Sequence, residues 1–227
     1  MILRRWEELP DNMRNEAVRP YYESLKRKKG SLLCKFIFDR IVSLVMLICL
    51  SPVFLIIAYK IRQDSPGPVF FRQERVTQYG KVFRIYKFRT MVENAETIGT
   101  QVTTKSDMRI TNIGKKLRGC RLDELPQLIN ILRGEMCFVG TRPEVVKYVE
   151  QYTPEMMATL LLPAGVTSEA SIEYKDEESL LSGAINADEN YIHTILPQKM
   201  AWNLQSIKKF AFFGEIQTMI KTVGAVL

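Results

Sequence analysis

The residues from 41 to 59 most strongly limit what this chain can fold into. They are nineteen consecutive uncharged residues, IVSLVMLICLSPVFLIIAY, in a chain of 227. At about 1.5 Å per residue, a straight helix of this length measures roughly 28 Å, nearly the thickness of the hydrocarbon core of a bilayer. Length alone therefore favours an ordinary transmembrane helix.

Two further features favour a broken helix instead. Pro52 lies near the middle of the segment and removes the hydrogen bond to the Ile48 carbonyl, where the Ser51 hydroxyl can satisfy a freed backbone group. Both flanks are basic, so a single crossing would place one basic cluster on the unfavoured face of the membrane. We therefore expect residues 36–62 to form a re-entrant helix hairpin with both ends on the cytoplasmic face. The flanking bases are Lys35, Arg40, Lys60, Arg62, Arg72 and Arg75.

Composition predicts one catalytic unit with a membrane element. An apolar content of 46% and a mean hydropathy of −0.08 are too apolar for a disordered chain and too polar for a bundle of membrane spans. We expect a basic N-terminal segment (1–35), the hairpin (36–62) and a catalytic domain (63–227). That domain is predicted to be α+β, mainly helical and cytosolic, with a short β element and amphipathic C-terminal helices.

One helical stripe near the C-terminus has two interpretations. Core packing is the default for such a stripe, and contact with the membrane surface is the alternative. Its members are Phe213, Ile216, Ile220, Val223 and Leu227.

The net charge of +7 is unevenly distributed along the chain. Residues 168–190 carry seven acids against one base, so the remainder carries +13. Such a surface attracts polyanions, which include nucleic acid, anionic lipid headgroups and phosphorylated substrates. The chain has no nucleic-acid-binding signature, and its aromatics are not interleaved with bases as a stacking surface requires. We therefore expect membrane lipids and phosphorylated ligands as partners, and no nucleic acid.

Cysteine and histidine content limits the metal chemistry. The four cysteines form no CxxC pair, which is typical of reduced thiols in a cytosol-facing protein. His193 is the only histidine, so a zinc site built on several histidines is excluded. Any metal is predicted to be a hard, oxygen-liganded cation such as Mg²⁺, for which Mn²⁺ can substitute.

Two short strands are predicted from 69 to 75 and from 81 to 91, around Gln78-Tyr79-Gly80. Lys87 and Arg89 are two residues apart in the second strand and would share one face. A phosphate contact and a solvent-facing edge strand explain this pair equally well.

The segment from 122 to 134 carries the strongest catalytic signal. Apolar residues recur at helical spacing, so Asp123 and Glu124 fall at the start of a predicted helix that ends at Gly134. Paired acids there can simply cap a helix. Clustered bases lie upstream and Arg142 lies downstream, and this combination suits phosphate and Mg²⁺ chemistry. The upstream bases are Lys115, Lys116, Arg118 and Arg121.

The ordered succession of motifs resembles the bacterial sugar transferase family, the monotopic phosphoglycosyl transferases. The resemblance runs from about residue 35 to about residue 165. The matching motifs are Ser51-Pro52, SPGPVFFRQ (65–73), YKFRTM (86–91), DMRIT (107–111), LDELPQL (122–128) and VGTRP (139–143).

The resemblance implies an activity and a role for each site residue. The family moves a sugar 1-phosphate from a UDP-sugar to polyprenyl (undecaprenyl) phosphate at the cytoplasmic face of the bacterial inner membrane, releasing UMP. Asp123 would be the nucleophile and Glu124 a Mg²⁺ ligand, in a pathway for capsule, exopolysaccharide or glycan. Lys87, Arg118 and Arg142 match the cations that the family uses around the diphosphate and nucleotide. The predicted substrate-binding residues also include Arg89, Thr141 and Pro143.

The sequence departs from the family pattern at three places. Thr141 replaces the first proline of Pro-Arg-Pro, and Arg121 replaces a small residue. Residues 165–171 replace a Gly-Ile-Thr-Gly pattern whose downstream arginine has no counterpart here. Two other classes of function compete with the enzyme: a non-catalytic membrane-surface scaffold for polysaccharide assembly, and a basic nucleic-acid binder. The sequence indicates neither the sugar nor the oligomeric state.

Overall fold

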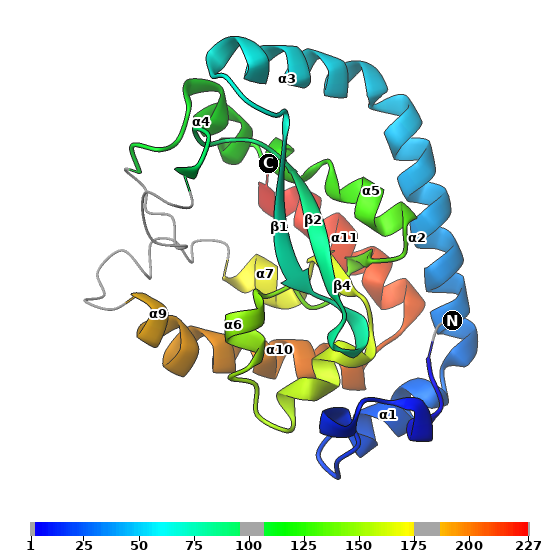
Figure 1. Ribbon diagram of the computed structural model, residues 1–227. Helices are drawn as coiled ribbons and strands as arrows, with labels where there is room; N and C mark the ends of the chain where they lie inside the picture. Colours follow the sequence, from blue (N-terminus) through cyan, green and yellow to red (C-terminus); the bar gives the residue numbers. More distant parts are fainter. Residues whose placement is uncertain (1–2, 96–106, 175–186, 227) are drawn as a thin grey trace.

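The computed structural model describes residues 3–95, 107–174 and 187–226. Its architecture is α+β and mainly helical, as predicted, with two small two-stranded sheets (Figure 1). The first half contains turns η1 (Trp6–Glu8), η2 (Asp11–Met13) and η3 (Gln78–Gly80), helices α1 (Arg19–Lys26), α2 (Lys29–Cys49), α3 (Ser51–Asp64) and α4 (Asn112–Gly119), and strands β1 (Phe70–Val76) and β2 (Val82–Phe88).

The second half is helical around one parallel strand pair. It contains turns η5 (Leu122–Glu124), η6 (Met156–Leu161) and η7 (Tyr191–Ile195), strands β3 (Met136–Val139) and β4 (Ala164–Thr167), and helices α5 (Gln127–Leu132), α6 (Val146–Val149), α7 (Glu169–Glu173), α9 (Ala187–Asn190), α10 (Leu196–Lys208) and α11 (Phe212–Val226). Three acids of the acidic window, Asp176, Glu177 and Glu178, lie outside the described residues.

The apolar segment folds as two helices, α2 and α3, bent by 62° where they meet at Leu50. As predicted, the break falls at Ser51-Pro52, and the Ser51 hydroxyl donates a hydrogen bond to the Ile48 carbonyl at 2.8 Å. No single described helix is long and apolar enough to cross a bilayer; α2 and α3 meet that test only as a bent pair. Figure 1 shows the pair as an arc along one side of the molecule.

The bent pair extends beyond the predicted range of 36–62, because α2 already begins at Lys29. The predicted boundary placed Lys35 in the basic segment before the hairpin. Instead its side chain is buried, where its ammonium donates to the Val139 carbonyl at 2.8 Å and pairs with Glu215 of α11 at 2.7 Å. Because these partners compensate the buried charge of Lys35, the helix continues through this residue.

The two predicted strands are present as β1 and β2, and β2 ends earlier than predicted, at Phe88. They pair antiparallel, with Val76 opposite Val82 across turn η3. Phe83 and Ile85 on its inner face pack with Leu128 and Ile131 of α5, and α2 covers the same core with partly buried side chains. Strands β3 and β4 run parallel. Because α5 is packed between β2 and α2, the residues that precede α5 lie beside the end of β2.

Interpretation of the C-terminal stripe as core is wrong for three of its members. Phe213, Ile220 and Val223 on α11 are 81%, 68% and 61% exposed. The packed face of α11 instead carries Glu215, Thr218 and Thr222, whose polar atoms are hydrogen-bonded. Leu227 lies outside the described residues.

Candidate active site

Glu124 lies at the centre of a buried charge cluster that joins three distant parts of the chain. Its Oε1 atom is 2.6 Å from Nη2 of Arg142 and 2.9 Å from Nζ of Lys87. Lys87 comes from β2, Glu124 from η5, and Arg142 from the loop after β3. Burial disfavours the ionised carboxyl, but the two cations outweigh it and hold the pKa of Glu124 far below its ordinary value. Glu124 is therefore a fixed negative charge.

Asp123 has different surroundings although it is the adjacent residue. It is 8% exposed, and its carboxyl group makes no hydrogen bond or ion pair with any residue that the structure describes. Burial raises the pKa of Asp123, while Lys87 and, more weakly, Arg118 and Arg142 favour the ionised form. The two acids therefore differ: Glu124 is held by two cations, and Asp123 has no hydrogen-bond or ion-pair partner among the described residues.

The backbone at the two acids differs from the predicted helix start. Leu122–Glu124 is a 3₁₀ turn, and the α-helix α5 begins only at Gln127. Arg121 before this turn is left-handed, with φ of 54°. A non-glycine residue is strained in this conformation, which ends the preceding segment and redirects the chain. The carboxylates therefore precede α5 in a tight turn and do not cap it.

Asn130 fixes this turn against β2, and sequence reasoning missed it. Its side chain is fully buried and accepts a hydrogen bond from the Tyr86 amide at 2.9 Å. Its amide group donates to the Arg84 carbonyl at 3.0 Å and to the Glu135 carboxylate at 2.7 Å. These bonds lock α5 onto the strand that carries Lys87. The available signal was one amide inside the otherwise apolar run Leu-Ile-Asn-Ile-Leu.

The loop that carries Arg142 is held by its backbone. Gly140 and Gly165 cross so closely that a Cβ on Gly165 would lie 2.1 Å from the Gly140 nitrogen. The Thr141 carbonyl accepts from the Gly165 amide at 2.8 Å, and the Pro143 carbonyl accepts from Arg75 at 3.2 Å. Hydrogen bonds to their carbonyls thus hold both sequence neighbours of Arg142, and the contact of Thr141 and Pro143 with substrate remains a prediction.

The other two predicted cations, Arg118 and Arg89, are not ion-paired with Glu124. Arg118 on α4 donates from Nε to the Thr90 hydroxyl at 3.0 Å and contributes to the field at Asp123. Arg89 does not share the site of Lys87: its buried guanidinium donates to the backbone carbonyls of Ser65, at 2.7 Å, and Pro66. β2 ends at Phe88, so the alternation of a strand does not extend to Arg89. Arg89 supports the turn after α3 in this structure.

The donor set suits a cation that arrives with a substrate. No group of three or more Asp, Glu, His or Cys side chains that could hold a metal occurs within the described ranges. Mg²⁺ commonly binds one or two protein carboxylates and completes its shell with substrate phosphates and water. Oε2 of Glu124 is less engaged than Oε1, with Arg142 Nη1 at 3.5 Å. Glu124 and Asp123 therefore fit this kind of site and do not form a complete cage.

A buried carboxylate without an ion pair among the described residues, beside a carboxylate held by two cations, is an arrangement suited to group transfer between phosphorylated substrates. Comparison with known proteins gives the particular family. The chain belongs to the bacterial sugar transferase family, whose sequence model matches residues 30–227.

Three curated relatives illustrate the likeness. The UDP-N-acetylgalactosamine-undecaprenyl-phosphate N-acetylgalactosaminephosphotransferase of Aeromonas hydrophila is 34% identical over 83% of this chain and 42% of its own length. The UDP-glucose:undecaprenyl-phosphate glucose-1-phosphate transferase of Escherichia coli K12 is 32% identical over 94% of this chain and 44% of its own. An uncharacterized sugar transferase of Bacillus subtilis is 34% identical over 86% and 88%. The chain thus spans less than half of the first two relatives.

Proposed function

We propose that the chain transfers a sugar 1-phosphate from a UDP-sugar to undecaprenyl phosphate in two covalent steps. The observation that carries this proposal is the contrast between two adjacent acids: Glu124 is ion-paired with two cations, whereas Asp123 lies in the field of the same cations without an ion pair among the described residues. The names of the relatives support the donor and acceptor classes. The product, a polyprenyl-diphosphate sugar, suits the start of capsule, exopolysaccharide or glycan assembly.

In the first step, a carboxylate oxygen of Asp123 attacks the β-phosphorus of the UDP-sugar. The bond from that phosphorus to the bridging oxygen breaks, and UMP leaves with the electron pair. In the second step, a phosphate oxygen of the acceptor attacks the same phosphorus and the acyl-phosphate bond breaks, which regenerates Asp123. Splitting one displacement into two is the general advantage of a covalent nucleophile.

The cations provide the charge stabilisation that this chemistry requires. Attack of an anion on a diphosphate needs the charge of the phosphate oxygens to be neutralised. Lys87 and Arg142 are held beside Asp123 by Glu124, and Arg118 lies within electrostatic reach. Glu124, with the diphosphate oxygens, would hold Mg²⁺, which when bound supplies further neutralisation at the leaving group.

The function is tested by supplying a panel of UDP-sugars with undecaprenyl phosphate and following UMP. We expect UMP to be released with at least one donor. This release should stop in EDTA and resume when Mg²⁺ or Mn²⁺ is added. Absence of UMP with every donor would favour the non-catalytic scaffold, and full activity in chelator would remove the metal role of Glu124. A nucleic-acid binder would instead retain DNA in a steeply salt-dependent manner.

The pH profile of kcat/KM is expected to be narrowed at both ends. Asp123 reacts as the carboxylate, and its raised pKa places the acidic limb above the ordinary aspartate value of about 4. Lys87 acts as the cation, and burial lowers its pKa, which places the basic limb below about 10.4. In Lys87→Arg the basic limb should move upward. An acidic limb at or below about 4 would contradict the assignment of Asp123.

The same proposal places the bent helix pair in the cytoplasmic leaflet as a hairpin. Its support is the exposed apolar surface on α2, where Ile41, Val45 and Ile48 are 58%, 53% and 64% exposed. Phe38 of α2 touches Phe212 at the start of α11, with ring centroids 5.5 Å apart. The start of α11, where Phe213 is exposed, therefore lies beside α2 and adds to its apolar surface, as expected for contact with lipid.

Cysteine labelling tests the hairpin. In a chain whose exposed native cysteines (Cys34, Cys49 and Cys120) are replaced by serine, Gly30→Cys and Gln63→Cys are both expected to react only from the cytoplasmic side. Periplasmic labelling of either position would contradict the hairpin. Pro52→Ala restores the backbone donor and is expected to shift part of the population towards a straight span, with Gln63→Cys labelled from the periplasm.

A further inference from the structure

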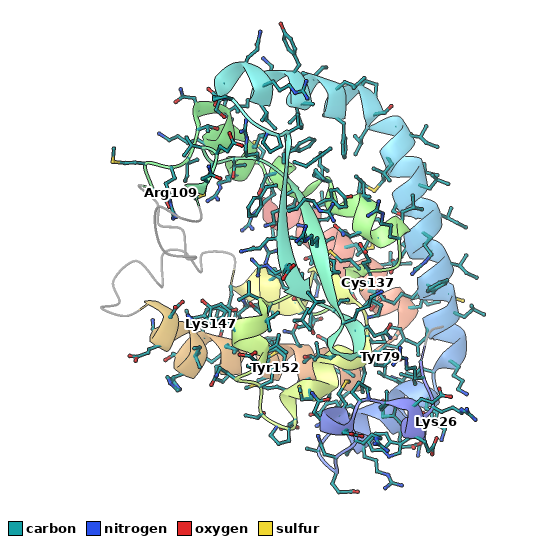
Figure 2. All side chains as sticks on the ribbon, viewed as in Figure 1. Lys26, Tyr79, Arg109, Cys137, Lys147 and Tyr152 are labelled. Atoms are coloured by element: carbon teal, nitrogen blue, oxygen red, sulfur yellow. The ribbon has the colours of Figure 1, made fainter. Side chains whose placement is uncertain are left out.

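A cavity of about 520 Å³ lies away from the candidate active site. It is lined by the first half of α2, the η3 turn, the residues between α5 and β3, Cys137 of β3 and the residues just before β4. Figure 2 labels two lining residues, Tyr79 and Cys137, on the side of the β1–β2 hairpin that faces α2. None of Lys87, Asp123, Glu124 and Arg142 lines it. Asp123 precedes α5 and this cavity follows it, so a helix about 9 Å long separates the two sites.

The cavity carries more positive charge than its acids neutralise. Its lining has five bases and only two acids: Asp39 lies 3.4 Å from Lys35, and Glu135 accepts a hydrogen bond from the neutral amide of Asn130. The four remaining bases have no carboxylate within 4.0 Å among the described residues. An anion that entered would therefore replace no internal ion pair. These bases are Arg4, Arg40, Lys81 and Arg133.

Three of these bases are positioned by aromatic rings, which leave their charge intact. The guanidinium carbons of Arg4, Arg40 and Arg133 lie 4.6, 3.3 and 5.3 Å from the ring centroids of Tyr79, Phe36 and Tyr86. Stacked guanidinium groups keep their edges free for the oxygens of a phosphate.

Arg40 is further fixed over Gly134. A Cβ on Gly134 would lie 2.5 Å from Nη2 of Arg40, so the guanidinium occupies the space that glycine leaves. Arg40 also donates from Nη1 to the Phe36 carbonyl at 2.9 Å.

The position of the cavity along α2 indicates the source of the anion. Phe36 and Arg40 line the cavity, while Leu33 and Ile37 on the same turns are each 48% exposed. Residues three apart on a helix are about 60° apart, so the cationic cavity borders the apolar surface directly. A lipid carries a phosphate and acyl chains in one molecule, so it can contact both the cationic cavity and the apolar surface of α2. A soluble anion can contact only the cavity.

We propose that this cavity binds the phosphate headgroup of an anionic membrane lipid, separately from the acceptor, and so anchors the first half of α2 at the membrane interface. This inference rests on the proposed hairpin and does not depend on the chemistry at Asp123. The test measures the Tm of the chain in neutral detergent with short-chain phosphatidic acid, phosphatidylcholine or inorganic phosphate added. Phosphatidic acid should raise Tm in a concentration-dependent manner, and the other two should have little effect.

The double variant Arg40→Gln/Arg133→Gln removes two charged donors and should weaken this response by at least about tenfold in apparent Kd, which corresponds to about 1.4 kcal/mol. The control Arg27→Gln/Arg62→Gln removes the same charge from exposed positions and should respond as the unaltered chain does. If the first variant folds poorly, Lys81→Gln at the exposed rim gives the same comparison. Equal responses of cavity and control variants, no response of the unaltered chain, or equal stabilisation by inorganic phosphate would each overturn the proposal.

The lipid-binding proposal and the catalytic proposal can be overturned independently of each other. Arg40→Gln/Arg133→Gln should still form the phosphosugar adduct with donor in detergent, because neither residue belongs to the active site. Asp123→Asn should keep the lipid response. Loss of the adduct in the cavity variant would show that the cavity belongs to the catalytic machinery, which would also overturn the proposal.

Discussion

Asp123→Asn is expected to reduce UMP release by about 10³-fold or more, the scale seen when a covalent nucleophile is removed. Asparagine preserves the shape of the side chain but removes the charge and the attacking oxygen. Because the Asp123 carboxyl has no partner among the described residues, the substitution breaks no hydrogen bond and no ion pair. Thermal stability should therefore be unchanged or slightly raised, since a buried charge is removed.

UMP release and membrane association should be measured together for this variant. Glu150→Gln is the matched control, because it removes the charge of an exposed carboxylate and should leave the rate unchanged. A rate within tenfold of the unaltered chain would show that Asp123 is not the nucleophile. A large loss of stability with the loss of activity would assign Asp123 a structural role instead.

Glu124→Gln is expected to reduce both activity and stability. It leaves Lys87 and Arg142 without their carboxylate in a largely buried site, and breaking such a pair costs about 3 kcal/mol. For a chain of this length, that corresponds to a fall in Tm of roughly 6–12 °C. Activity should fall by about 10²-fold or more, because Lys87 and Arg142 lose their fixed position and the metal loses a ligand.

A double variant separates these two effects. Lys87→Met combined with Glu124→Gln removes one of the two unpaired cations and should recover part of the lost stability. Activity should stay low, because neither the metal ligand nor the cation is restored. Recovery of activity together with stability would show that Glu124 acts only by holding the fold.

Local chemistry made the helix break predictable from the sequence. The effect of Pro52 on the Ile48 carbonyl and the rescue by Ser51 involve residues within one turn of a helix, and the structure has that hydrogen bond. The extent of α2 was not predictable in the same way. Lys35 is tolerated inside the helix because Glu215 and the Val139 carbonyl, both distant in sequence, lie beside it.

The candidate site was predictable in its membership and only partly in its geometry. The motifs indicated Lys87, Asp123, Glu124 and Arg142, and in the structure Lys87 and Arg142 both form ion pairs with Glu124. Strand alternation failed for Arg89 because the strand ends one residue earlier. Helical periodicity showed which residues of α11 share a face, but partners elsewhere in the chain decide which face is packed.

Intact-protein mass spectrometry after incubation with the UDP-sugar alone tests the central claim most directly. The active chain should gain the mass of one sugar phosphate and release one UMP before any lipid is added, and undecaprenyl phosphate should then remove the adduct. Asp123→Asn should gain nothing, while Glu150→Gln should behave as the unaltered chain does. Absence of the adduct under conditions that support turnover, or an adduct that survives in Asp123→Asn, would contradict a covalent mechanism at Asp123.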